Sequence, residues 1–262
     1  MRERTQLEEQ LGALSQLERE LDDAITLVEL GEAEGDADTE KEGVEALKAV
    51  LKEAQSKGQL NRDAAQLQRV RAIAARLVPA TAVFRQDAPG WKWEVNVISS
   101  NEVNAWCMPG GKIAFYTGIL RQLKLTDDEV AMVMGHEIAH ALREHAREQA
   151  SKNALTKIGA VGLSIATGGK YDGLVSTGAN LLSLSYSRSD ETDADLVGLD
   201  IAARAGYDPR AGITLWQKMG QTGGDEPPKF MSTHPPRSDR VKDLTKYSER
   251  VMPLYQQARA RG

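Results

Sequence analysis

The sequence predicts an α+β fold that is mainly helical, contains a small sheet and is preceded by an acidic helical hairpin. Apolar residues make up 41% and charged residues 27% of the 262 residues, close to globular averages, which excludes a wholly disordered or collagen-like chain. Over much of the chain apolar residues recur every three or four positions, as on one face of a helix. Segment 91–97 alternates instead with a period of two, which is typical of a strand. We therefore expect a small sheet packed beside helices.

The acidic helical hairpin is expected over residues 1–57, and residues 58–262 are expected to form a separate domain. Residues 1–60 carry seven Lys and Arg against 16 Asp and Glu, whereas the rest of the chain carries 26 against 22. An apolar stripe from Leu7 to Ile25 indicates the first helix, and a second stripe begins at Val44. The acidic, glycine-punctuated segment 31–39 separates them. This pattern is typical of a solvated helical arm.

Residues 1–52 resemble the N-terminal helical segment of a bacterial class I peptide-chain release factor. The resemblance lies in the run RERTQLEEQLGALSQLERELDDAITLVELGEAEGDADTEKEG. Those factors release peptides through a Gly-Gly-Gln tripeptide, and this sequence contains none. The segment is therefore not expected to terminate translation by that route, and it is consistent with a fused or mosaic N-terminus.

Composition and charge exclude several classes of protein. The net charge of −5 argues against a general nucleic-acid binder. Cys107 is the single cysteine, which excludes an internal disulfide framework and a zinc site built from several cysteines. It is expected to be a small buried apolar residue rather than a nucleophile. No apolar run approaches the ~20 residues needed to span a bilayer, and the first ten residues lack the apolar core of a secretory signal. We therefore expect neither a transmembrane segment nor a signal peptide in this chain.

The elements that follow residue 58 are a helix and then strands. Asn61 is placed to cap a helix that runs toward Leu77 and stops before Pro79. After the strand over 91–97, segments 103–107 and 113–116 flank a Met-Pro-Gly-Gly loop, which predicts a hairpin or tight loop between strands. These segments supply the expected small sheet.

A metal-binding motif follows a predicted helix start. Thr126 and Glu129 have the spacing of a capping box, and the helix leads into His136-Glu137-Ile138-Ala139-His140. Residues four apart lie one above the other on a helix, so His136 and His140 can bind a single ion. Glu137 lies where its carboxylate can contact a metal-bound water, as in the His-Glu-x-x-His zinc proteases. The alternative is a pair of ordinary helix histidines.

A catalytic zinc usually takes three protein ligands and one water, so a further ligand is required. His145 lies away from the ligand face of a continued helix and is expected to be a surface or packing residue. Glu191 and Asp195 are four apart on a predicted helix. Glu191 would be the third ligand, and Asp195 would accept the outer N–H of a ligand histidine. Both could instead belong to a solvated acidic cluster over 190–195. Gly198 continues their face and predicts tight packing on the histidine helix.

Residues from about 59 to 255 resemble the M48 family of zinc metallopeptidases, particularly its soluble bacterial members. Four motifs carry the resemblance in the family's order: Asn104-Ala105-Trp106 with Pro109-Gly110-Gly111, His136-Glu137-x-x-His140, Glu191-x-x-Ala-Asp195, and Ser232-Thr233-His234-Pro235 with Arg240. The resemblance implies a gluzincin-type metallopeptidase domain. It also implies one Zn²⁺ per chain, bound by His136, His140 and Glu191.

The resemblance implies roles for the other motif residues. Glu137 would be the general base. In this family the equivalent of His234 lies near the metal, where it could donate to the oxyanion or instead occupy the open zinc position and silence the enzyme. Arg240 could neutralise charge in the same loop or form a helix-surface salt bridge. Asn104 and Ala105 would lie on an edge strand whose backbone pairs with an extended substrate, although the same segment could be a buried strand.

These observations lead us to expect a zinc-dependent endopeptidase that hydrolyses unfolded or misfolded polypeptides. The resemblance implies the bacterial periplasm or cell envelope, although the absence of a leader would favour the cytoplasm. The alternatives are a latent enzyme and a non-proteolytic zinc-fold module with chaperone-like binding, and the intact Glu137 argues against the latter. Apolar segments 158–167 and 174–182 predict a helical excursion that covers the site, and a peripheral membrane contact or a homo-oligomer stays open.

Overall fold

The computed structural model describes residues 51–145 except 53 and 109, residues 186–222, and residues 228–261 except 236. Most of the acidic segment 1–57 and both apolar segments, 158–167 and 174–182, lie outside the described residues. The expectations for them therefore remain predictions.

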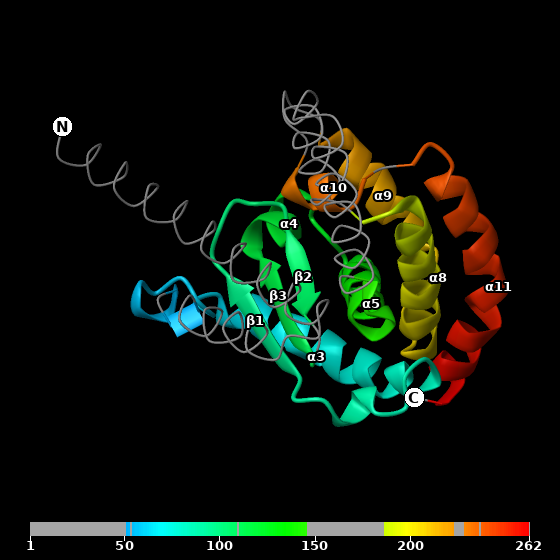
Figure 1. Ribbon diagram of the computed structural model, residues 1–262, viewed down its shortest axis with the longest axis horizontal. Helices are drawn as coiled ribbons and strands as arrows, with labels where there is room; N and C mark the ends of the chain where they lie inside the picture. The colour runs from blue at the N-terminus through cyan, green and yellow to red at the C-terminus, as the bar shows by residue number, and fades with distance from the viewer. Residues whose placement is uncertain are drawn as a thin grey trace, which may run out of the picture.

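The described chain is mainly helical and contains one small sheet, which confirms the expected fold class (Figure 1). In chain order the elements are α3 (Ala64–Leu77), the 3-10 helices η1 (Val78–Val83) and η2 (Ala88–Gly90), β1 (Glu94–Ile98), β2 (Ala105–Met108), β3 (Lys112–Tyr116), α4 (Thr117–Gln122), α5 (Asp127–Arg143), α8 (Arg188–Arg204), α9 (Ala211–Gln221), α10 (Lys229–Thr233) and α11 (Arg240–Arg261). Figure 1 shows the sheet, α5, α8 and α11 lying side by side, with α3 crossing one end of this layer.

The sheet has the strand order β1-β3-β2, so β3 is central. β1 pairs with β3 in parallel, and β2 pairs with β3 in antiparallel orientation, with Ala105 opposite Phe115 and Met108 opposite Lys112. The predicted hairpin over 103–116 is thus confirmed. Among the described residues β2 has a strand on one side only, and its neighbour in Figure 1 beyond the sheet is α5. The sheet edge therefore borders the histidine helix.

Two local details differ from the sequence-based expectations. The cap of α3 is Asp63, whose side chain accepts from the backbone N–H of Gln66 at 3.1 Å. Asn61 has φ of 57°, and its side-chain oxygen accepts from the Val97 N–H at 2.8 Å. An N-cap residue needs extended backbone angles, so Asn61 joins the chain to β1 instead of capping the helix. Strand β1 also begins at Glu94, after Trp91.

Helices α5 and α8 pack closely because glycines meet where they cross. A β-carbon built on Gly135 would lie 2.7 Å from the Gly198 carbonyl oxygen, and one built on Gly198 would lie 2.6 Å from the His136 nitrogen. Real β-carbons do not approach so closely, so each position requires glycine. The prediction that Gly198 allows tight packing on the histidine helix is confirmed.

Capping boxes fix the starts of both helices. Thr126 and Glu129 exchange side-chain and backbone hydrogen bonds at the start of α5, as the sequence predicted. Ser187 and Asp190 do the same at the start of α8. The cap of α8 directly precedes Glu191, whereas the cap of α5 lies ten positions before His136.

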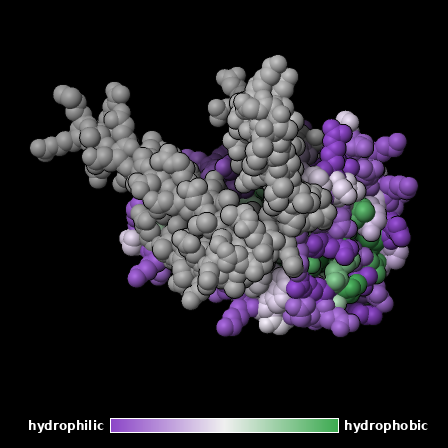
Figure 2. All heavy atoms as spheres, in the orientation of Figure 1, coloured by the Kyte–Doolittle hydropathy of each residue, from purple (hydrophilic) through white to green (hydrophobic). Residues whose placement is uncertain are grey.

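The described surface is mostly hydrophilic over α11, with hydrophobic side chains visible between α8 and α11 (Figure 2). Among the described residues Val83 is the one large hydrophobic side chain classed as exposed, at 56%. Within ranges 51–145, 186–222 and 228–261, no helix has the length and apolar character needed to cross a membrane.

Candidate metal centre

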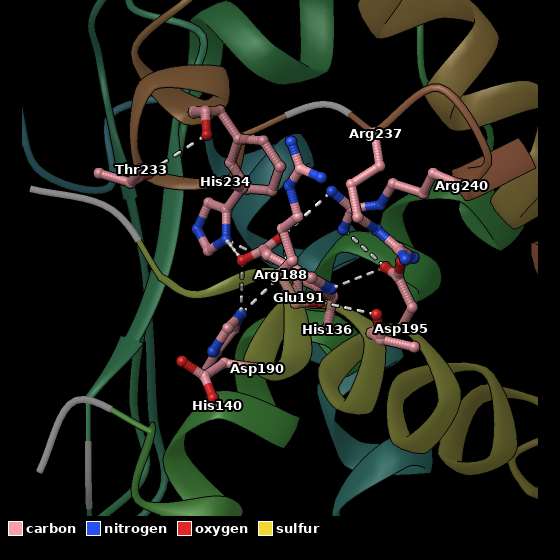
Figure 3. Close-up of polar contacts among 12 residues, drawn as sticks. His136, His140, Arg188, Asp190, Glu191, Asp195, Thr233, His234, Arg237 and Arg240 are labelled. Carbon is pink, nitrogen blue, oxygen red and sulfur yellow. Dashed lines mark hydrogen bonds and ion pairs between the residues drawn. The ribbon is translucent and has the colours of Figure 1, made fainter. Parts of the chain in front are cut away.

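Four buried side chains converge between the sheet and the helices. Helix α5 supplies His136 and His140, α8 supplies Glu191, and the residue that ends α10 is His234 (Figure 3). One ligand atom from each of the four lies within 4.8 Å of all the others. The structure therefore brings together the three ligands expected from the sequence and adds the histidine of the downstream loop.

The spacing of these atoms fits a tetrahedral metal ion. His140 Nε2 lies 3.1 Å from His136 Nε2 and 3.4 Å from Glu191 Oε1, and His136 Nε2 lies 3.7 Å from Glu191 Oε2. Zinc bonds of about 2.0–2.1 Å at tetrahedral angles place ligand atoms about 3.3 Å apart. Two imidazoles and a carboxylate are a donor set that suits zinc.

Asp195 and Arg240 hold the outer side of the centre. Asp195 Oδ1 lies 3.1 Å from His136 Nδ1 and accepts from Arg240 Nη2 at 2.7 Å. Arg240 Nη1 lies 2.9 Å from Glu191 Oε2, and its guanidinium is 3.3 Å from the centre of the Trp216 ring. Arg240 is only 1% exposed, so the alternative of a helix-surface salt bridge is wrong.

The alternative of a solvated acidic cluster over 190–195 is wrong for three of its four acids. Glu191 is fully buried, Asp195 is buried against His136, and Asp190 is buried in the capping box of α8. Only Asp193 is partly exposed, at 39% of its side chain.

His234 lies against both the ligands and the expected base. Its Nδ1 is 2.8 Å from Glu191 Oε1 and 3.2 Å from His136 Nε2. Its Nε2 is 3.4 Å from Glu137 Oε1, and the Phe230 ring stacks on it at 4.5 Å. From this position His234 can act either as a fourth ligand or as a hydrogen-bond donor to a bound substrate.

Burial and mutual attraction set the protonation of the centre. Burial raises the pKa of Glu137, although the nearby His234 and His136 oppose that shift. Burial also lowers the pKa of His140 well below its ordinary value, which keeps its ring neutral and able to bind a metal. Burial acts against the charge of Glu191 as well, but His234 and His136 outweigh it and lower the pKa of Glu191.

Asn104 and Ala105, which were expected to contact a substrate, lie on or beside the edge strand. The Tyr116 N–H donates to the Asn104 carbonyl at 3.1 Å, so by antiparallel alternation the main-chain groups of Ala105 and Cys107 point away from β3. Asn104 Oδ1 accepts from the Ala105 N–H at 2.9 Å. Both side chains are buried, so the strand is at once an edge and part of the core.

Cys107 is half-buried, and its thiol points into protein. Burial raises the pKa of this thiol well above its ordinary value, and the charge of Glu137 acts in the same direction. A thiol held protonated is a poor nucleophile, in agreement with the expectation from the sequence.

Sequence reasoning missed three residues that contact the centre. Tyr186 stacks on the His140 ring at 3.9 Å, and Arg237 Nη2 lies 3.7 Å from Asp195 Oδ2. His145 was expected either at the helix surface or in packing, and the structure agrees with packing because the residue is 5% exposed. What was missed is its partner, since its Nδ1 is 3.0 Å from His140 Nδ1. Nothing in the local sequence signals these contacts, because each depends on where a loop or helix end folds back.

The sequence model of peptidase family M48 matches residues 64–248. Over 173 residues the chain is 39% identical to the mitochondrial metalloendopeptidase OMA1 of Arabidopsis thaliana, which covers 65% of this chain and 35% of that protein. Over 178 residues it is 32% identical to the mitochondrial metalloendopeptidase OMA1 of Saccharomyces cerevisiae, covering 64% of this chain and 51% of that protein. Over 174 residues it is 28% identical to the β-barrel assembly-enhancing protease of Escherichia coli O157:H7, covering 62% of this chain and 36% of that protein. The chain thus matches between about a third and a half of the length of these relatives.

Proposed function

Because the chain belongs to peptidase family M48, we propose that it is a zinc-dependent endopeptidase that cleaves unfolded or misfolded polypeptides. The observation that carries the proposal is the convergence of His136, His140 and Glu191 on one point, with the buried Glu137 beside them. We propose one zinc ion per chain at this point, within a peptidase domain that spans residues 58–262.

Bound zinc supplies Lewis-acid activation of a water molecule and of the scissile carbonyl. Glu137 takes a proton from the attacking water and delivers it to the leaving amine. Asp195 accepts the Nδ1–H of His136 and so directs Nε2 of that ring toward the centre.

An extended substrate is proposed to pair with the outer edge of β2. The main-chain groups of Ala105 and Cys107 point away from β3, and α5 is the element beyond this edge of β2 (Figure 1). The Ala105 N–H already donates to Asn104 Oδ1, so a substrate carbonyl would replace that side-chain oxygen. Backbone pairing reads no side chains, which supports a preference for unfolded chains over a strict sequence code.

Quality control in the cell envelope is the proposed setting. The E. coli relative, named a β-barrel assembly-enhancing protease, supports this setting, whereas the relatives named mitochondrial support an organelle of eukaryotic cells. We also keep as proposals a peripheral membrane contact and a homo-oligomer.

Casein cleavage by the zinc-loaded chain beside its Glu137→Gln variant tests the proposal. We expect cleavage by the parent and a loss of at least about 10²-fold in the variant, with equal zinc content in both. If the parent and the variant both hold zinc and both leave casein and an unfolded reporter intact, the proposal of an active endopeptidase is refuted.

A latent enzyme is the second candidate, because His234 Nδ1 lies 3.2 Å from His136 Nε2 and 2.8 Å from Glu191. The same casein assay on His234→Ala separates the two roles of this histidine. Faster cleavage by the variant would support an inhibitory fourth ligand. A loss of about 10²–10³-fold would support a donor to the oxyanion.

A further inference from the structure

His145 reaches the metal centre because α5 ends earlier than its sequence suggests. The helix stops at Arg143, and Glu144 has left-handed backbone angles, with φ of 55° and ψ of 36°. The Glu144 carboxylate is bound by Arg85 Nη1 at 2.8 Å, which holds the turn in place. The turn redirects the next residue, so the His145 ring lies beside His140 instead of on the outer face of a continued helix.

The contacts of His145 run from a hydrogen bond with His140 to an ion-pair contact with Asp193. His145 Nδ1 is 3.0 Å from His140 Nδ1, and the two rings meet edge to face at 75°. His145 Nε2 is 3.5 Å from Asp193 Oδ2. Asp193 Oδ2 also lies 2.9 Å from Arg143 Nε, so an ion pair at the end of α5 anchors the far end of the line.

The roles of the ring nitrogens follow from these distances. His140 Nε2 faces the cluster, 3.4 Å from Glu191 Oε1, so metal binding leaves the proton of that ring on Nδ1. A proton on His140 Nδ1 needs an acceptor, and His145 Nδ1 is the atom in reach. His145 then carries its own proton on Nε2, which faces Asp193.

We propose that His145 is a positioning residue for His140, fixing its tautomer and ring orientation for metal binding. The inference rests on the proposed metal site. The two ligand histidines would then be held in parallel ways: His136 donates to Asp195, backed by Arg240, and His140 donates to His145, backed by Asp193. Loss of such outer partners typically costs 10–100-fold in metal affinity.

Two substitutions separate positioning from packing. His145→Phe keeps a ring but removes the acceptor, and we expect zinc affinity to fall about 10–100-fold. His145→Asn places its Oδ1 near the position of the lost Nδ1, and we expect affinity within about threefold of the parent. Zinc affinity is measured by competition with a chromophoric chelator on the full chain, together with the melting temperature of each metal-free protein.

Equal zinc affinity in the parent and both variants would overturn the inference, as would equal loss in both variants with unchanged metal-free melting. Asp193→Asn is expected to lower affinity by a smaller factor than His145→Phe, whereas Asp200→Asn, on the same helix but paired with Arg204, should leave it unchanged. Failure of the proposed metal site has a different signature, because the parent chain would then bind no zinc in the same titration, and failure of the proposed peptidase activity would show only in the casein assay.

Discussion

Arg240 is the residue that allows two acids to be buried beside each other. It lies between Glu191 and Asp195, at 2.9 and 2.7 Å, with its guanidinium over the Trp216 ring. Removing one partner of a buried ion pair leaves an uncompensated charge, which costs far more than the intact pair contributes. Arg240 is therefore important both for stability and for the shape of the metal centre.

Replacing Arg240 with Met is expected to lower the free energy of unfolding of the metal-free protein by about 3–5 kcal/mol. Arg250 lies exposed on the same helix, so Arg250→Met should change the free energy of unfolding by no more than about 0.5 kcal/mol. Urea denaturation of both variants checks the comparison. A loss below 1 kcal/mol for Arg240→Met would contradict the role given to this arginine.

The buried carboxylate of Glu129 leads to a prediction about how the stability of the fold depends on pH. It is buried, and it accepts from Lys218 Nζ at 2.6 Å and from Thr214 Oγ1 at 2.8 Å. Burial alone would raise its pKa, but Lys218, the Thr126 N–H and Thr214 together outweigh burial and lower the pKa below the ordinary 4.5. A lowered folded-state pKa means that the ionised carboxylate stabilises the fold above about pH 4.5 and that this stability is lost as pH falls through the folded value.

We expect Glu129→Gln to lower the free energy of unfolding by about 1.5–3 kcal/mol at pH 7. The difference from the parent should shrink steadily below pH 4.5, because protonation makes the parent carboxyl neutral as well. Urea denaturation at pH 7, 5 and 3.5 measures it. A difference that stays constant over this range would show that the charge of Glu129 is not what stabilises the contact.

At the scale of elements, the crossing of α5 and α8 determines the separation of the ligands. His136 follows Gly135 directly, and a side chain at Gly198 would strike its backbone nitrogen at 2.6 Å. Any increase in the distance between these helices moves Glu191 away from the two histidines. The glycine pair is thus as important to the metal site as the ligands themselves.

Gly198→Ala is expected to destabilise the protein by about 1–3 kcal/mol and to weaken zinc binding. The matched control is Gly220→Ala in α9, where a β-carbon meets nothing within 4 Å and alanine should be neutral or stabilising by up to about 1 kcal/mol. Thermal unfolding with and without zinc measures both effects. Unchanged zinc affinity in Gly198→Ala would contradict the argument that the helix crossing sets the geometry of the ligands.

At the scale of the whole molecule, the metal would join elements that are far apart along the chain. Its candidate ligands come from α5, from α8 and from the end of α10. A ligand that binds only the folded state stabilises it in proportion to the logarithm of its excess over Kd. Metal occupancy should therefore be visible in the unfolding of the entire described domain.

Removal of zinc by a chelator is expected to lower the melting temperature by about 10 °C, since a thousandfold excess over Kd contributes about 4 kcal/mol. Readdition of zinc should restore the original value. His136→Ala should show neither response, because this variant lacks His136 Nε2, one of the candidate ligand atoms. A melting temperature of the parent that does not change with chelation would contradict a metal bound between these elements.

The sequence was most informative where chemistry depends on local spacing. The histidines of α5, the capping box at Thr126 and the small residue at Gly198 follow from helical periodicity, and the hairpin follows from its turn residues. Contacts between segments that are distant in the chain were harder to predict from the sequence. Whether Arg240 lay at the surface or between two buried acids depended on how α11 packs against α8.

The placement of His145 shows why the remaining features could not be predicted. Where a helix ends in a left-handed residue, that residue is usually glycine and sometimes asparagine, so Glu144 gives no such signal. Its conformation is supported by Arg85, 59 positions earlier in the chain. Asn61 was misassigned as a helix cap for a related reason, because its hydrogen bonds go to β1 rather than to the helix that follows.

The order in which the ligands occur in the chain has a consequence for synthesis. The two histidines of α5 precede Glu191, which precedes His234 and Arg240. At about 5–20 residues per second, a ribosome needs roughly 5–20 seconds to travel from the first of these positions to the last. Throughout that interval the nascent chain carries the proposed base, Glu137, without the arginine that pairs with Glu191 and Asp195. The proposed cleavage of unfolded chains could therefore begin only after the enzyme's own chain has been made as far as Arg240.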